Sequence, residues 1–334
     1  MALMLGIMES SKLKSLDSAI FVADQGFGIK VYKWSATGFG TKYSDPATMP
    51  IATGRGVSVN TVNRTVALSG QGSPYITAYP WSNTGFGTAY TSPPALPGIS
   101  YSVAFNPAGT ALVASHDVSP FVTAYPWSAG FGTAYSNPST IPTGNGYDVA
   151  FNPNGTYVAL GHNSSPFVSV YSWSNGFGSK VSDPSSLTSA GYGVAFGNST
   201  NVIAIASSGS PYINVYPFTS SFGTKYSNPG TLPTGWGRKV AFTPTDNAIA
   251  VTHTNSPFVT AYPWSAGFGT KYADPSGITA VNDGADVAFS PAGNQIVVGH
   301  DNGIQAYPWS PGFGTKYANP SPGLSGAANG ISFI

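Results

Sequence analysis

A unit of about 46 residues recurs seven times along the 334-residue chain, and this repeat constrains the fold more than any other feature. The phenylalanine of a Gly-Phe-Gly motif, once Ser-Phe-Gly, returns every 45 to 47 residues, and an aromatic residue, usually Trp, stands four or five positions ahead of it. A fixed period of this length with strand-like content is typical of β-propellers. The seven phenylalanines are Phe39, Phe86, Phe131, Phe177, Phe222, Phe268 and Phe313.

The unit that starts at Asp148 shows how one repeat folds. Residues 148–151 are a short apolar strand, and residues 152–155, Asn-Pro-Asn-Gly, are a turn because Pro presets φ and Asn-Gly tolerates positive φ. Strands at 157–162 and 167–173 follow, and a shorter, more polar fourth strand comes after the Gly-Phe-Gly turn. Four short strands separated by turns make one propeller blade. The sequence therefore predicts an all-β, seven-bladed propeller of four-stranded blades.

The two ends of the chain predict how the ring closes. Residues 19–23 match the second strand of the unit and have no first strand before them, whereas Gly330–Phe333 match a lone first strand. One blade is therefore expected to combine three N-terminal strands with one C-terminal strand, which removes the open edge of the sheet series. The propeller is expected to span residues 19–334.

Composition limits the possible functions. Only 7% of the residues are charged and the net charge is +1, which argues against a nucleic-acid partner because phosphate binding needs clustered Lys and Arg. The absence of cysteine excludes disulfides and thiolate chemistry, and no apolar run reaches the length of a membrane span.

Residue types with catalytic or metal-binding chemistry are scarce. The 12 acidic residues offer no paired carboxylates at a suggestive spacing, and several precede Pro as turn formers. The four histidines occupy one equivalent position in separate repeats, so they cannot converge on one ion; they are His116, His162, His253 and His300. We therefore expect a non-enzymatic protein with no cofactor, no metal site and structural histidines.

The residues that depart from the repeat indicate a binding face. In a propeller the loop entering each first strand opens on one face around the central channel. Two of the three Arg in the chain lie there, together with Tyr and Trp, the residue types that dominate binding hot spots. The predicted partner-binding face consists of Arg55, Tyr101, Tyr147, Tyr192, Trp236, Arg238, Asp283 and Asn329. The alternative, that these loops are merely exposed and vary freely, stays open.

Residues 1–18 stand outside the repeats. Leu3, Leu5 and Ile7 could form one apolar side of a segment with Lys12 and Lys14 at its polar end. We expect this segment to dock into a neighbouring subunit, with a frayed terminus as the alternative.

The sequence motifs of the repeat resemble those of two groups of proteins. Val-Ala-Phe-Asn-Pro-x-Gly, a second strand ending in Gly-His and a third ending in Tyr-x-Trp resemble the WD-repeat propeller family from Ala19 to the end of the chain. The longer string Trp-Ser-x-Gly-Phe-Gly-Thr-Lys-Tyr-Ser-Asp-Pro is more similar to propeller proteins of tailed bacteriophages.

The phage resemblance implies a structural protein of the virion, a capsid- or tail-associated decoration or adhesion propeller. It would hold other virion proteins through residues 1–18 and present its loop face to a host surface glycan or protein. The WD-repeat resemblance implies the alternative, a soluble cytoplasmic scaffold for protein partners.

Overall fold

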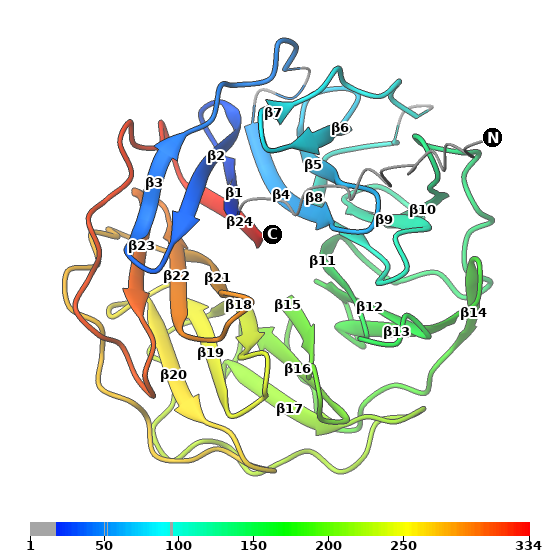
Figure 1. The fold of residues 1–334 in the computed structure, drawn as a ribbon. Helices are drawn as coiled ribbons and strands as arrows, with labels where there is room; N and C mark the ends of the chain where they lie inside the picture. Colours follow the sequence, from blue (N-terminus) through cyan, green and yellow to red (C-terminus); the bar gives the residue numbers. More distant parts are fainter. Residues whose placement is uncertain (1–17, 50, 52, 94–95) are drawn as a thin grey trace, which may run out of the picture.

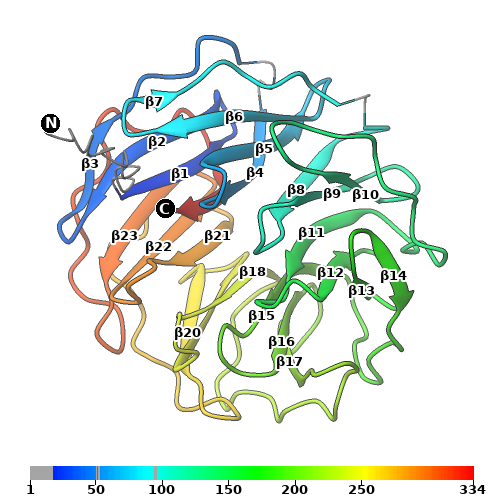
Figure 2. The same ribbon diagram turned by 45° about the vertical axis from the view of Figure 1, so that its right-hand side comes forward.

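Seven antiparallel sheets stand radially around a common axis in the computed structural model, which describes residues 18–49, 51, 53–93 and 96–334. Figure 1 shows the ring along its axis, and Figure 2, turned by 45°, shows the same radial order of sheets. No helix occurs in these residues. The arrangement confirms the predicted seven-bladed propeller.

The blades follow one another in chain order, and each begins with its innermost strand. Blade 1 contains β4 (Thr53–Asn60), β5 (Thr65–Gln71), β6 (Ile76–Ser82) and β7 (Gly85–Phe86); blade 2 contains β8 (Ser100–Phe105), β9 (Ala111–His116) and β10 (Val122–Pro126); blade 3 contains β11 (Gly146–Phe151), β12 (Tyr157–His162), β13 (Val168–Trp173) and β14 (Phe177–Lys180). Blade 4 contains β15 (Gly191–Phe196), β16 (Val202–Ser207) and β17 (Ile213–Pro217); blade 5 contains β18 (Gly237–Phe242), β19 (Ala248–His253) and β20 (Val259–Pro263). Blade 6 contains β21 (Gly284–Phe289), β22 (Gln295–His300) and β23 (Gly303–Pro308); blade 7 contains β24 (Ala328–Phe333), β1 (Ala19–Asp24), β2 (Gly28–Ser35) and β3 (Gly38–Lys42).

Blade 7 closes the ring as the sequence predicts. The C-terminal strand β24 pairs antiparallel with β1, in a register that runs from Ile20 opposite Phe333 to Ala23 opposite Gly330. The two ends of the chain therefore share one sheet, which is visible in Figure 1 as the red strand beside the dark blue one. All six residues of β1 are buried, so the closure lies inside the core.

The expectation of four strands in every blade is wrong for blades 2, 4, 5 and 6, whose sheets have three strands in the described residues. Their outer segments keep a single bridge, such as Trp127 to Phe131, and one further hydrogen bond, such as Tyr135 N to Ala124 O at 2.9 Å. The outer segments are short, contain Gly and end at Pro, so they are too weak to form a continuous ladder. In the part of the chain that the structure describes, a fourth strand is present only in blades 1, 3 and 7.

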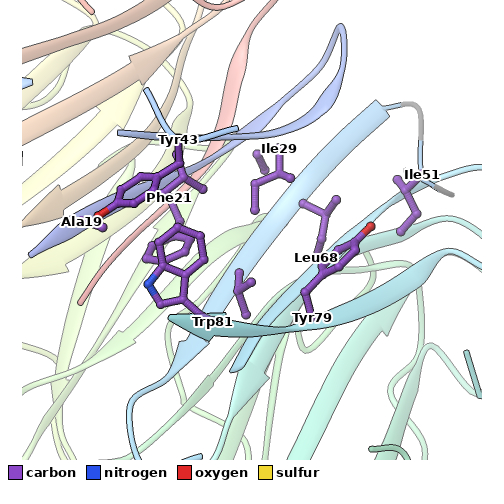
Figure 3. Packing of buried hydrophobic residues seen from close by; sticks show 11 residues of the cluster. Ala19, Phe21, Ile29, Tyr43, Ile51, Leu68, Tyr79 and Trp81 are labelled. Carbon is purple, nitrogen blue, oxygen red and sulfur yellow. The ribbon is translucent and has the colours of Figure 1, made fainter. Parts of the chain in front are cut away.

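The repeated Trp packs between neighbouring blades. Trp81 of blade 1 meets Phe21 and Tyr43 of blade 7 edge-on, with ring centroids 4.7 Å and 4.9 Å away (Figure 3). Only 3% of Trp81 is exposed, and Leu68 and Tyr79 of its own blade complete the cluster. These contacts agree with the interpretation of the repeated aromatics as core residues and not as a sugar-stacking ring.

Candidate functional site

A pocket of about 260 Å³ opens on the face where the inner strands begin. Seven of the eight residues predicted for a binding face line it. Its lining comprises Arg55, Tyr101, Tyr147, Tyr192, Arg238, Lys239, Asp283, Ala285 and Asn329.

The eighth predicted residue, Trp236, is not part of this lining. Trp236 directly precedes β18 and is 49% exposed, and its backbone N–H donates to Thr254 Oγ1 in the β19–β20 hairpin. Lys239 and Ala285 line the pocket but were not among the predicted residues. The signal for Lys239 was its place directly after Arg238, where most other repeats carry a small residue or Asp.

A β-bulge at the start of each inner strand places these side chains. In blade 2, Ser100 pairs with His116 and Ser102 pairs with Ser115, so Tyr101 is the extra, unpaired residue. In blades 1, 3, 4, 6 and 7 the same register shift leaves one residue unpaired, namely Arg55, Tyr147, Tyr192, Ala285 or Asn329. In blade 5 the shift leaves both Arg238 and Lys239 unpaired. A bulge re-aims the side chain of its extra residue, so seven bulges direct seven side chains to one place.

Three tyrosines form an arc along one side of the pocket. Tyr147 stacks on Tyr192 with centroids 4.6 Å apart and an interplanar angle of 20°, and Tyr101 meets Tyr147 edge-on at 5.4 Å. Guanidinium groups cover both ends, with Arg55 5.8 Å from the Tyr101 ring and Arg238 5.0 Å from the Tyr192 ring. Burial raises the pKa of Tyr101 and of Tyr147, so both phenols stay neutral and can donate hydrogen bonds.

The two arginines differ in their partners. Arg238 forms a bidentate pair with Asp283, with Nε to Oδ1 at 3.0 Å and Nη2 to Oδ2 at 2.7 Å. Burial raises the pKa of Asp283, although Arg238 acts in the opposite direction. Arg55 Nε makes no hydrogen bond within the described part of the chain, although it is buried. The pocket lining therefore contains both the Arg55 guanidinium, whose Nε–H has no acceptor, and a carboxylate with a raised pKa.

The pocket floor contains buried charges from three blades. Lys239 forms an ion pair with Asp148, which also accepts hydrogen bonds from Ser102 Oγ at 2.8 Å and Val194 N at 2.9 Å. Burial favours the neutral form of Lys239, but its carboxylate neighbours more than offset this and hold its pKa above the ordinary value. The floor therefore presents an ammonium group that is fixed in place by Asp148.

A second carboxylate near the floor, that of Asp286, ties blade 6 to blade 7. It accepts hydrogen bonds from Val287 N at 2.7 Å and from Ile331 N of β24 at 2.6 Å. Burial raises the pKa of Asp286 to about 6, against the effect of Lys239. Asp286 therefore links the charge network of the pocket to the strand that closes the ring.

The four histidines do not contribute to the pocket. Each is fully buried in its own blade; for example, His162 Nε2 lies 3.0 Å from Ser169 Oγ and His253 Nε2 lies 2.8 Å from Thr260 Oγ1. Burial lowers the pKa of His116, His162 and His253 to about 4, so they are neutral near pH 7. Among the residues that the structure describes, no cluster of three His, Cys, Asp or Glu side chains could hold a metal ion.

Other expectations concern segments or properties that the fold does not address. Leu3, Leu5 and Ile7 lie outside the described residues, so docking through residues 1–18 stays a prediction. The location of the protein, in a virion or in the cytoplasm, also stays a prediction. No helix in the described part of the chain is long and apolar enough to cross a membrane.

Comparisons with known proteins support the architecture. Neither a family model nor a curated protein matches the sequence. Among solved structures, the chain is similar to a candidate 6-phosphogluconolactonase from Bacteroides uniformis, with a TM-score of 0.73 and 13% identity over 95% of this chain and 100% of the other. It is also similar to a candidate 6-phosphogluconolactonase from Bacteroides fragilis, with a TM-score of 0.72 and 12% identity over 97% and 99% of the chains. A protein from Lactobacillus plantarum gives a TM-score of 0.73 at 14% identity over 95% and 99%.

These similarities establish the fold and correct the functional expectation. The sequence led us to expect a non-enzymatic structural protein of a phage virion, with a cytoplasmic scaffold as the alternative. Two of the three similar structures are instead named for a hydrolase activity, and none of the three is named as a phage or WD-repeat protein. The expectation of a non-enzymatic virion component is therefore wrong on this comparison.

Proposed function

We propose that this protein is a hydrolase of sugar lactones and that the reaction takes place in the pocket at the channel mouth. The observation that carries the proposal is that one pocket is lined by the Arg55 guanidinium, whose Nε–H has no acceptor, and by the Asp283 carboxylate, whose pKa is raised. Lactone hydrolysis needs these two functions, a donor for the carbonyl oxygen and a base for water. The names of the similar structures favour the same reaction class.

The proposed reaction opens the ring ester with one water molecule. Asp283 accepts a proton from water as the water oxygen attacks the lactone carbonyl carbon, and the N–H groups of Arg55 stabilise the negative charge on the carbonyl oxygen. Collapse of the tetrahedral intermediate breaks the bond between the carbonyl carbon and the ring oxygen. The ring oxygen takes up the proton from Asp283, and the product is a hydroxy acid. Arg238 holds the Asp283 carboxylate in position throughout.

The remaining lining suits a sugar. The tyrosine arc provides aromatic surface and neutral hydroxyl donors, and Asn329 and Lys239 add further polar groups to the lining. Its three cationic groups, Arg55, Arg238 and Lys239, can also accept a phosphorylated sugar. The phage resemblance implied that the loop face binds a host surface glycan or protein. We propose instead that this face binds a small sugar substrate.

Activity measurements on the purified full-length protein test the proposal. Acid release from glucono-1,5-lactone and from 6-phosphogluconolactone is followed in weakly buffered solution, with spontaneous hydrolysis subtracted. We expect Arg55→Ala and Asp283→Asn each to lower kcat/KM about 100-fold, the effect typical of removing an oxyanion donor or a general base. Val62→Ala, at an exposed site on the β4–β5 turn, is the control and keeps the wild-type rate.

Two results would contradict the proposal. One is a wild-type rate no greater than spontaneous hydrolysis for both lactones. The other is wild-type activity in both pocket variants, provided that circular dichroism shows them to be folded.

A further inference from the structure

On the pocket face, the hairpins between second and third strands are shorter in blades 6 and 7 than in the other five blades. The hairpins between second and third strands lie on the pocket face, because the end of the second strand pairs with the start of the inner strand, as His162 does with Gly146. In blades 1 to 5 these hairpins have four or five residues, at 72–75, 117–121, 163–167, 208–212 and 254–258. In blades 6 and 7 they have two and three residues, at 301–302 and 25–27.

The same two blades carry the smallest bulged side chains around the pocket. Blades 1 to 5 contribute Arg or Tyr at this position, whereas blades 6 and 7 contribute Ala285 and Asn329. Two features, hairpin length and the size of the bulged side chain, thus distinguish blades 6 and 7 from the rest of the ring. We call residues 25–27, 301–302, Ala285 and Asn329 the low sector.

The backbone of the low sector packs directly against the strand that carries Arg55. Asn329 Nδ2 donates to Gly54 O at 2.8 Å, next to Arg55. Gly28, directly after the short hairpin of blade 7, approaches Gly54 so closely that a Cβ on Gly54 would lie 2.0 Å from the Gly28 carbonyl oxygen. The short hairpin of blade 7 therefore lies beside the proposed reaction site.

The surface of the low sector has the chemistry of a sugar subsite. Phe27 is 58% exposed, and the Lys30 ammonium lies 4.7 Å from its ring centroid. Gln25 is an exposed amide in the same hairpin as Phe27, and Asn302, exposed in the short hairpin of blade 6, donates from Nδ2 to Thr279 O at 3.3 Å. The carboxylates at the hairpin ends already accept backbone hydrogen bonds, Asp24 from Gly26 and Ser325 and Asp301 from Val281 and Asn282. An exposed aromatic ring with an exposed amide in the same hairpin fits the apolar face and the hydroxyl groups of a neutral sugar.

We propose that the low sector binds the second sugar ring of an extended substrate, so that the protein acts on disaccharide lactones, in which a further sugar is linked to the lactone ring. This inference rests on the proposed function, because the lactone ring is placed at Arg55 and Asp283. The second ring then passes over Ala285 and Asn329 and stacks on Phe27. A compact sugar lactone fills the pocket but leaves this surface unused.

Titration calorimetry with stable reaction products tests the inference. Gluconate represents the compact product, and cellobionate, which has one more glucose unit, represents the extended product. We expect cellobionate to bind about tenfold more tightly, the gain from about 1.4 kcal/mol of added contact. Phe27→Ala, which removes the aromatic ring, and Ala285→Trp, which rebuilds the rim, should both bring the two dissociation constants within about twofold. Val118→Ala, at an exposed site in the long hairpin of blade 2, should leave the ratio unchanged.

The outcomes separate this inference from the proposed function. Hydrolysis of gluconolactone together with equal binding of the two aldonates overturns the low sector alone, as does an unchanged ratio in both Phe27→Ala and Ala285→Trp. Binding of cellobionate that depends on Phe27, with no hydrolysis of any lactone, keeps the sugar subsite and overturns the proposed reaction. If neither aldonate binds, the low sector is not a sugar site.

Discussion

Removal of the closing strand should destabilise the whole ring. A chain that ends at Asn329 loses Gly330–Ile334, and with them the pairs from Ile20–Phe333 to Ala23–Gly330 and the hydrogen bond from Ile334 N to Ala19 O at 3.1 Å. The burial of Ile331, which is 9% exposed, is worth about 2 to 3 kcal/mol. Phe333, whose ring meets Trp34 at 5.2 Å, adds about 1 kcal/mol, and about four backbone hydrogen bonds add roughly 1 kcal/mol each.

The sum, roughly 7 kcal/mol, is comparable with the total stability of an ordinary domain, about 5 to 15 kcal/mol. The truncation also leaves the Asp286 carboxylate without its hydrogen bond from Ile331 N, which increases the loss. We therefore expect the melting temperature to fall by about 15 °C or more, at roughly 2 to 4 °C per kcal/mol for a protein of this size or somewhat smaller.

Thermal and urea unfolding, followed by circular dichroism, provide the measurement. The double variant Ile331→Ala/Phe333→Ala is the matched control, because it removes the side chains and keeps the backbone pairing of β24 with β1. It should lose only about half as much stability as the truncated chain. An unchanged melting temperature and urea midpoint in the truncated protein would refute the closure argument.

Two further perturbations test the contacts between blades. A Cβ at Gly193 would lie 2.6 Å from the carbonyl oxygen of Arg238 and 2.8 Å from Lys239 Cα, so Gly193→Ala should lower the free energy of unfolding in urea by about 2 kcal/mol. The control is Gly230→Ala, whose Cβ would have no atom within 4 Å and which should change stability by less than about 0.5 kcal/mol. Equal effects of the two substitutions would be inconsistent with the close approach of β15 and β18. The pKa of Asp286 is raised from 3.8 to about 6 in the folded protein, so its contribution to stability is fully present below about pH 4 and is lost as the pH rises through 6. Relative to Asp286→Asn, the wild type should therefore lose up to about 3 kcal/mol between pH 4 and pH 7, and parallel stability curves for the two proteins would exclude this role.

The architecture was predictable because its causes are local. The period follows from the Gly-Phe-Gly turns, the strand boundaries from Pro and Gly, and the closure from a lone first strand at Gly330–Phe333. The prediction failed at the outer strands of four blades, where weak edge pairing decides between a short strand and a single bridge. Local propensity does not resolve so small a difference in free energy.

The candidate pocket was partly predictable. Repeat-breaking residues such as Arg55 and Tyr101 stood out in the sequence, and symmetry implied that equivalent positions share one face of the ring. The bulges that turn these side chains into the pocket were not visible, because a bulge depends on the register between two strands. Trp236 does not line the pocket for a related reason, because it precedes the bulged residue by two positions and its exposed side chain is not turned by the bulge.

The ion pairs of the site depend on the tertiary structure alone. The scarcity of acidic residues led us to expect no enzyme, because carboxylates were judged by their spacing along the chain. Lys239 and Asp148 are 91 residues apart in sequence, yet they form one ion pair on the pocket floor. Arg238 and Asp283 are likewise 45 residues apart and meet only because their blades are neighbours. A ring converts one position per repeat into a shared site, so its charges, burial and pKa values depend on distances between blades that no local pattern in the sequence encodes.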